Sequence, residues 1–338
     1  MIELTRRAAM LSAAAFAISA SLGTAVAQEA KDYVLNTAST GGTYHPVGTA
    51  ISTLSKVKLL PKQKFSLTAV NSAGSGANVQ AMGSGAADFA ILQGLFGSYA
   101  ASGTGPVSAP QTNMRSVTML WQNVEQFGIT NDMVKTGTVE DLKATKGMSV
   151  GMGRKNSGTI GSNTVLLSGL GMDVSADFQL VDAGYGPTAD ALANGHAVAA
   201  GIPSGPPTGA ITKLMASNGD KFTILDVTDE QLTAMDGGRN LWTRYTIAAG
   251  TYPGQDKDIQ TIAQPNFLAV NANVDEEHVY QLTKTMYENL GFLTAIHPAT
   301  KAMKIEAAMA GLPLPLHPGA AKYYKEVGLD IPDRLMAK

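Results

Sequence analysis

The chain of 338 residues predicts an α/β protein of two domains, and three observations support this prediction. The length exceeds what one hydrophobic core ordinarily serves. Strand-like and helix-like segments alternate over residues 33–93 and again over 148–202, a pattern typical of parallel sheets covered by helices. The chain then closes with helical sequence after residue 276. We expect these last helices to return to the first domain, because they follow the whole of the second.

The individual elements are predicted from local composition and periodicity. Short runs of β-branched, aromatic and aliphatic residues indicate strands, and longer runs compatible with a helical period indicate helices. In the first block we expect strands from Tyr33 and at 65–70 and 88–93, with helices at 47–56 and 77–82. In the second block we expect strands at 148–152, 178–181 and 197–202, with helices at 160–170 and 188–193. Further strands are expected at 115–120, 126–130, 222–227 and 259–270, the last interrupted by Pro265, and further helices near Asp229 and at 276–295, 301–310 and 320–327.

Three strand-to-helix turns rich in glycine, hydroxyl residues and asparagine predict one polar pocket. They lie at residues 39–46, 71–76 and 153–159. In the first turn Pro46 opens a helix, and proline is favoured there because that amide has no helical partner to lose. A helix N-terminus carries roughly half a positive charge and several free N–H donors, so it attracts an anion. Because such turns gather at the carboxyl ends of parallel strands, we expect them to share one cleft.

The candidate ligand-binding residues lie on these turns or at the ends of neighbouring strands. Gln93 ends a strand that faces the first two turns, and its amide either binds the ligand or makes a structural hydrogen bond. Tyr185 follows another strand and either covers the cleft or packs in the core. The full set is Thr40, Gly41, Gly42, Thr43, Tyr44, Gly74, Ser75, Gly76, Asn78, Gln93, Ser157, Gly158, Thr159 and Tyr185, with Pro203 and Ser204 as further candidates.

Composition excludes several classes of function. A net charge of −2, with no cluster of lysine and arginine, gives no footprint for nucleic acid. The chain has no cysteine, so disulfides, a thiol nucleophile and Cys-ligated zinc are excluded, and its five histidines show no metal-ligand spacing. Residues 153–159 resemble a phosphate-binding loop, but Thr159 stands where that motif needs lysine. Glycine turns without a catalytic base predict a protein that holds a ligand, not an enzyme, and that needs no cofactor.

The first 27 residues are predicted to be a targeting segment. Arg6 and Arg7 precede an apolar run at 8–22, and residues 25–27 (AVA) offer the small-x-small pattern that signal peptidase cleaves. The run is too short and too rich in alanine for a membrane anchor, so we expect cleavage after Ala27 and export without membrane insertion. The paired arginines fit either an ordinary secretory signal or twin-arginine export.

Four further stretches are distinctive in combination: residues 39–46 (STGGTYHP), 248–256 (AAGTYPGQD), 282–290 (LTKTMYENL) and 311–320 (GLPLPLHPGA), with Ser157-Gly158-Thr159 as a fifth element. Together they resemble the TAXI family, the extracytoplasmic solute receptors of TRAP transporters. The resemblance covers the chain from Tyr33 to its end. Each glycine turn alone is unspecific, but the combination is specific.

The resemblance implies a type II periplasmic-binding fold, in which two α/β domains joined by a hinge clamp a ligand between them. Domain I would comprise residues 28–118 and 262–338, and domain II residues 119–261, with hinge crossings near 117–125 and 258–268. The resemblance also implies integral membrane TRAP subunits as partners and a periplasmic location. It further implies a small carboxylate ligand, either glutamate or glutamine or a dicarboxylate such as 2-oxoglutarate. Monomer is the default expectation.

The sequence leaves two questions open. The loop 151–159 is about two residues longer than the usual family pattern and contains Arg154 and Lys155, which either reach the cleft or form a solvated basic pair at a loop tip. The receptor could also serve an ATP-driven importer or a sensor kinase, or the fold could carry a hydrolase or lyase. The absence of a paired nucleophile and base argues against the last of these.

Overall fold

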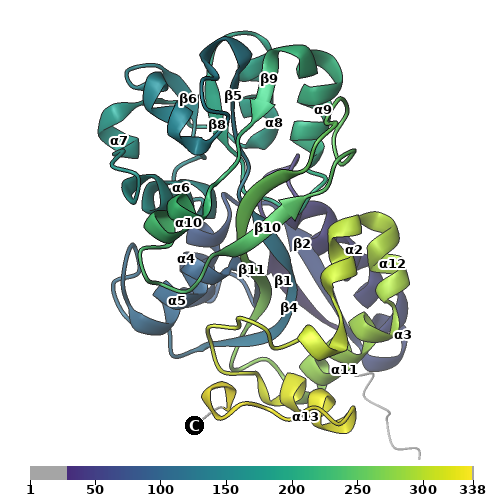
Figure 1. Ribbon diagram of the computed structural model, residues 1–338. Coiled ribbons are helices and arrows are strands. Elements are labelled where there is room, and N and C mark those ends of the chain that lie inside the picture. The colour runs from purple at the N-terminus through teal and green to yellow at the C-terminus, as the bar shows by residue number, and fades with distance from the viewer. Residues whose placement is uncertain (1–28, 337–338) are drawn as a thin grey trace, which may run out of the picture. The chain divides into compact units, whose positions relative to one another are not determined.

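The computed structural model describes residues 29–336, and the predicted targeting segment lies outside them. All elements described below belong to one compact unit that begins at Lys31. This unit contains two separate β-sheets with helices packed against them (Figure 1). We call the six-stranded sheet with its helices the first lobe, and the five-stranded sheet with its helices the second lobe.

The sheet of the first lobe mixes parallel and antiparallel strands. Its order is β10-β11-β3-β1-β2, with β4 also paired to β11. The three strands of the first sequence block are mutually parallel, whereas β11 runs antiparallel to each of its neighbours. The strands are β1 (Lys31–Asn36), β2 (Phe65–Val70), β3 (Phe89–Gln93), β4 (Met114–Val124), β10 (Thr243–Ile247) and β11 (Ile259–Asn271).

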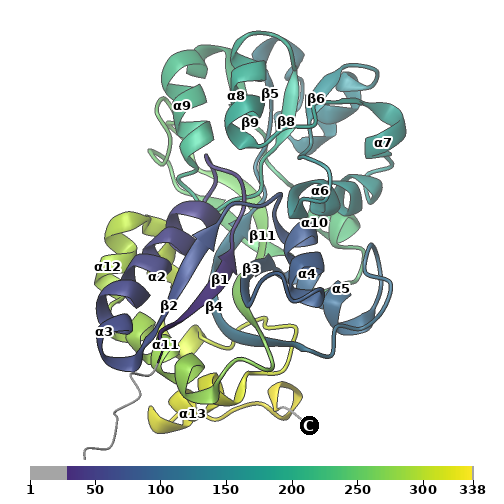
Figure 2. The same ribbon diagram turned by 180° about the vertical axis from the view of Figure 1, so that it is seen from behind.

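Helices from both ends of the chain cover this sheet. α2 packs against β2 and against α11 and α12 of the C-terminal region, so the chain does return to its first lobe (Figure 2). The helices are α2 (Tyr44–Lys58), α3 (Leu60–Gln63), α4 (Ser75–Gly83), α5 (Gly94–Ser102), α11 (Glu276–Glu288), α12 (Leu290–Ile296) and α13 (Pro318–Glu326). Short 3-10 turns η4 (Pro298–Ala302), η5 (Ile305–Ala307) and η6 (Asp333–Leu335) join or follow them.

The sheet of the second lobe has the order β7-β6-β8-β5-β9. β6 is parallel to β7 and β8, whereas β5 is antiparallel to both of its neighbours. Its strands are β5 (Phe127–Thr130), β6 (Ser149–Gly151), β7 (Gln179–Leu180), β8 (Ala199–Gly201) and β9 (Phe222–Ile224). Its helices are α6 (Gly158–Ser168), α7 (Val174–Asp177), α8 (Tyr185–Ala193), α9 (Gly209–Asn218) and α10 (Asp229–Asp236), with 3-10 turns η1 (Asn131–Met133), η2 (Val139–Thr145) and η3 (Gly219–Lys221).

The two sheets share one plan. In each, the first strand of the sequence block lies between the second and third, and a strand from elsewhere in the chain joins the third strand in antiparallel orientation. This is the strand order of the type II periplasmic-binding fold, and it confirms the predicted α/β fold class.

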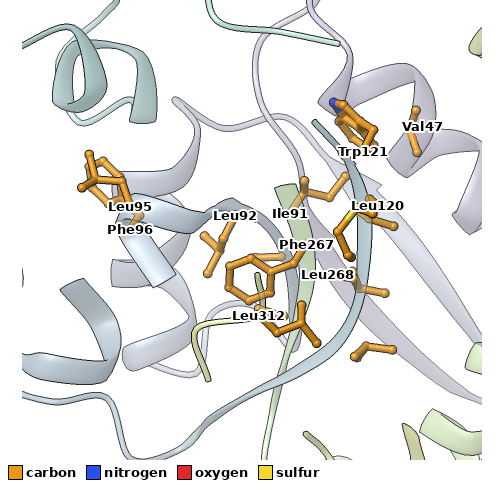
Figure 3. Close-up of a cluster of buried hydrophobic side chains, with 14 of the residues drawn as sticks. Val47, Ile91, Leu92, Leu95, Phe96, Leu120, Trp121, Phe267, Leu268 and Leu312 are labelled. Atoms are coloured by element: carbon orange, nitrogen blue, oxygen red, sulfur yellow. The ribbon is translucent and has the colours of Figure 1, made fainter. Parts of the chain in front are cut away.

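A few apolar strand residues form the core beneath the site. Phe267 and Leu268 of β11 are fully buried, and they pack between Leu92 of β3 and Leu120 of β4 (Figure 3). Buried aliphatic and aromatic side chains contribute roughly 1.5–3 kcal/mol each when removed from water. Gln93 is the last residue of β3, directly after this buried core, and it lines the cavity described below.

Three predicted elements are wrong in form. The strand at 259–270 was expected to break at Pro265, but β11 runs through this residue. The pairing of β11 with β4 shifts register between Asn266 and Phe267, and proline, which has no N–H group to donate, is found in strands at such irregularities. The expected helix at 301–310 is replaced by the turns η4 and η5. The long helix expected at 276–295 is divided at Asn289, whose backbone leaves the helical conformation.

Candidate functional site

A small cavity lies between the two lobes, at the carboxyl ends of their parallel strands. The space inside it that is open to the centre of a water molecule is about 40 Å³. Both lobes supply its wall. The lining residues are Ala38, Ser39, Gly42, Thr43, Tyr44, Ala73, Gly74, Ser75, Gln93 and Asn123 from the first lobe, and Arg154, Ser157, Gly158, Thr159, Ala183, Gly184, Tyr185, Pro203 and Ser204 from the second.

Five helices begin at this cavity. The residues immediately preceding α2, α4, α5, α6 and α8 are Thr43, Gly74, Gln93, Ser157 and Gly184, and all five line the wall. The first amides of a helix have no partner within it, and the helix dipole places positive charge at the same end. The cavity is therefore surrounded by backbone donors and positive helix ends.

The residues that precede α2, α4, α5 and α8 do not cap their helices with a side chain, and none of the five helices has an acidic residue in its first turn. Three first-turn amides have partners: Leu95 N–H donates to Gln264 Oε1, Ala77 N–H to the carbonyl of Asn156, and Ile160 N–H to Ser157 Oγ.

Two helices that begin elsewhere differ: α10 has a capping box from Thr228 and Gln231, and α11 is capped by Asp275, each with two acidic residues in its first turn. However, α3, α9 and α12 also begin away from the cavity without a side-chain cap or an acidic first turn, so these features alone do not mark the site.

The charge of the wall has one sign. Arg154 is the only lysine, arginine, aspartate or glutamate among the lining residues of the described chain, and its side chain is exposed at the rim. Burial raises the pKa of the Tyr44 and Tyr185 hydroxyls well above the ordinary tyrosine value, so both remain neutral. Tyr44 donates to Asn266 Oδ1 (2.6 Å), and Tyr185 donates to the carbonyl of Pro203.

Several hydrogen bonds join the two lobes around the cavity. Gln93 Nε2 donates to the carbonyl oxygen of Gly158 (2.9 Å), and Thr43 Oγ1 donates to that of Gly205 (2.9 Å). The amide of Ala77 donates to the carbonyl oxygen of Asn156 (2.9 Å). Asn156 adopts a left-handed backbone conformation, with φ of 61°. The lobes are therefore in direct contact on more than one side of the site.

The structure brings ten of the fourteen predicted site residues, and both further candidates Pro203 and Ser204, to the cavity wall; the ten are Gly42, Thr43, Tyr44, Gly74, Ser75, Gln93, Ser157, Gly158, Thr159 and Tyr185. Four others lie outside it. Thr40 is exposed, and Gly41 accepts a hydrogen bond from the amide of Ala210. Gly76 faces Asn156, and Asn78 donates to the carbonyls of Thr37 and Ile91, which holds the turn before α4 in place.

The prediction omitted several lining residues. Asn123 was expected in a connector between two strands, but it belongs to the extended β4, and no glycine turn marks it. Ser39 lies one residue ahead of the predicted set. Ala183 and Gly184 precede α8, which begins three residues earlier than expected. A prediction that treated every strand-to-helix junction as equivalent would have included Gly184.

Neither metal binding nor a membrane-spanning element is evident in the described region. Within residues 29–336 no three side chains among His, Asp and Glu are grouped so as to hold a metal ion. Within the same residues no helix combines the length and the apolar character needed to cross a membrane.

The two sheets with a cavity between them define the two-lobed α/β fold class, and comparison with known proteins gives the family. The chain belongs to the NMT1-like family, whose model matches residues 35–328. Among solved structures, it is similar to MatC from Rhodopseudomonas palustris with bound malate, at 12% identity over 88% of this chain and 99% of that one, with a TM-score of 0.54.

Two further solved structures share the fold. A protein from Bordetella bronchiseptica is 12% identical over 90% of each chain, with a TM-score of 0.52. A binding-protein component of a phosphonate ABC transporter from Pseudomonas aeruginosa is 11% identical over 80% of this chain and 79% of that one, with a TM-score of 0.51. Identities this low establish a common fold alone.

Proposed function

We propose that the protein is an extracytoplasmic solute receptor that binds a small organic acid between its two lobes. The observation that carries this proposal is the convergence of five helix N-termini on one cavity that contains no carboxylate. A hydrogen bond to a charged group contributes roughly 1.5–3 kcal/mol, and micromolar affinity requires about −8 kcal/mol. A few backbone and hydroxyl donors are therefore sufficient.

Binding would be coupled to closure of the lobes about a hinge. Neither lobe alone surrounds the cavity, so only the closed arrangement brings Ser157, Gly158 and Thr159 against a ligand already held by Thr43 and Tyr44. We place the hinge at two crossings within the predicted ranges 117–125 and 258–268, where β4 leads into β5 and where β11 begins, so that domain I corresponds to the first lobe and domain II to the second. At this point the amide of Glu125 donates to the carbonyl of Ile262, which ties the two crossings together.

The sequence resemblance extends the proposal to a TAXI receptor of a TRAP transporter, exported to the periplasm and acting as a monomer with integral membrane subunits. Glutamate, glutamine and dicarboxylates such as 2-oxoglutarate are the first ligands to test. The fold shared with a phosphonate ABC transporter component supports one alternative, a receptor for an ATP-driven importer. Uptake into proteoliposomes energised by an ion gradient or by ATP separates the two.

The ligand class is tested by differential scanning fluorimetry and calorimetry with a panel of small carboxylates. At least one acid should raise the melting temperature and bind with micromolar or tighter affinity. Amines and neutral sugars of the same size should have no effect. If no carboxylate stabilises the protein, the proposed function is wrong.

Replacing Arg154 by glutamine should weaken binding of that acid about threefold, because an exposed charge contributes only ~0.2–1 kcal/mol. The loss should shrink as salt is raised, since screening weakens exposed pairs. Lys155→Gln is the matched control: it removes the same charge from the adjacent exposed residue, which does not line the cavity. Equal losses of affinity in the two variants would show that Arg154 contributes only to the overall positive potential of the loop and makes no specific contact with the ligand.

A further inference from the structure

One buried acceptor in the cavity wall has no partner among residues 29–336. Asn123 lies on β4, lines the cavity and is 2% exposed. Its Nδ2 donates to Gln93 Oε1 (3.2 Å), but among the described residues nothing donates to its Oδ1. A buried acceptor left unsatisfied costs roughly 1–3 kcal/mol. A ligand with a hydrogen-bond donor at this point would recover that free energy.

The contacts around Asn123 fix which of its two amide atoms stays free. The carbonyl oxygen of Gly158 can only accept, so the Gln93 side chain must present Nε2 to it. This orientation turns Gln93 Oε1 toward Asn123, which must then present Nδ2 and leave Oδ1 free. Because Gly158 belongs to the second lobe, contact between the lobes determines which amide atom of Asn123 faces Gln93 and which stays free.

The other features of the cavity wall favour some hydrogen-bond donors on a ligand over others. A ligand ammonium group would face five positive helix ends and Arg154 with no carboxylate on the wall to balance it. A hydroxyl group donates one hydrogen bond without adding charge. A keto group can only accept, and it would leave Asn123 Oδ1 unsatisfied.

We infer that the preferred ligand is a small 2-hydroxy acid, whose carboxylate is held by the helix N-termini and whose hydroxyl donates to Asn123 Oδ1. The small volume of the cavity requires the two groups to be close together. This inference rests on the proposed function, because it specifies the acid that the same site selects. Asn123 is then the residue that sets specificity, and Gln93 is a positioning residue.

Matched acids that differ only at carbon 2 test the inference by calorimetry. The three sets are lactate, pyruvate and alanine; malate, freshly prepared oxaloacetate and aspartate; and 2-hydroxyglutarate, 2-oxoglutarate and glutamate. In whichever set binds, the hydroxy acid should bind about tenfold more tightly than the oxo acid, and the amino acid should bind most weakly. Equal or tighter binding of an oxo or amino acid overturns the inference but leaves the proposed function intact. If no member of any set binds, the inference is overturned, and the proposed function is decided separately by the wider panel of carboxylates.

Two variants separate this role from a structural one. Asn123→Leu removes the acceptor, and Gln93→Leu lets the Asn123 amide turn, so each should reduce the tenfold preference to about twofold or less. The ratio of the two affinities is the readout, since a general packing defect weakens both acids together. Gln122→Leu is the control, because Gln122 is the adjacent residue on β4 and lies outside the cavity wall. It should keep the preference. An unchanged preference in folded Asn123→Leu also overturns the inference.

Discussion

Replacing Gly76 by alanine should weaken ligand binding about a hundredfold without destabilising the free protein. Gly76 does not line the cavity, but a β-carbon there would lie 2.6 Å from the carbonyl oxygen of Asn156 in the other lobe. Real β-carbons do not approach so closely, so the lobes would have to separate by several tenths of an ångström. The expected loss equals one or two charge-assisted hydrogen bonds, roughly 1.5–3 kcal/mol each.

The control for this variant is Gly291→Ala. Gly291 is the second residue of α12, as Gly76 is of α4, but a β-carbon at Gly291 meets nothing within 4 Å. Alanine favours a helix over glycine by up to about 1 kcal/mol, so neither substitution should lower the melting temperature of the free protein. Calorimetry should show unchanged affinity for Gly291→Ala. Unchanged affinity for Gly76→Ala would contradict closure of the lobes onto the ligand.

Replacing Glu125 by glutamine should raise the free energy of unfolding at pH 8 by about 3 kcal/mol. Glu125 is fully buried between β4 and β5. Trp242 Nε1 (3.0 Å) and Gln264 Nε2 (3.4 Å) donate to its Oε1, and its Oε2 has no partner among the described residues. Burial raises the pKa of the carboxyl from 4.5 to about 7, against the opposing effect of these two hydrogen bonds.

Because the pKa of Glu125 is raised in the folded protein, the free energy of unfolding should fall as pH rises. The unfolded chain loses the Glu125 proton near pH 4.5, whereas the folded protein keeps it until about pH 7. Between these values the folded state binds more protons, so stability falls as pH rises and the loss is complete above about pH 7. The difference of about 2.5 pH units corresponds to about 3 kcal/mol. Glutamine does not titrate, so the variant lacks this loss.

Urea denaturation at pH 5 and pH 8 measures the effect. The variant should match the parent at pH 5 and exceed it at pH 8. Glu288→Gln, at an exposed residue, should change neither value by more than about 0.5 kcal/mol. A Glu125→Gln variant that gains nothing at pH 8 would show that the buried carboxyl is compensated in some other way.

The fold class could be predicted because the alternation of strands and helices, and the residues that form the turns between them, can be recognised from a few neighbouring residues at a time. The turn around Thr43 and Tyr44, the one at Gly74 and Ser75, and the one at Ser157 were all expected at strand ends, and the structure places each of them at the cavity. Their function as ligand contacts remains a prediction.

Contacts distant in sequence could not be predicted in the same way. Asn123 lies in a strand with no local mark, and its role depends on Gln93, thirty residues earlier, and on Gly158 in the other lobe. Asn78 carried the same turn chemistry as its neighbours, but its amide holds two backbone carbonyls of the first lobe. Composition cannot separate a polar residue that faces a ligand from one that holds a turn.

The five helix ends have an evolutionary consequence. Every amino acid except proline carries the same backbone N–H group, so point substitutions at these positions leave most of the anion-holding donors in place. Changes in ligand choice would then arise at the few side chains that reach the cavity. A lineage with this architecture could exchange one organic acid for another through one or two mutations and never pass through a receptor that binds nothing.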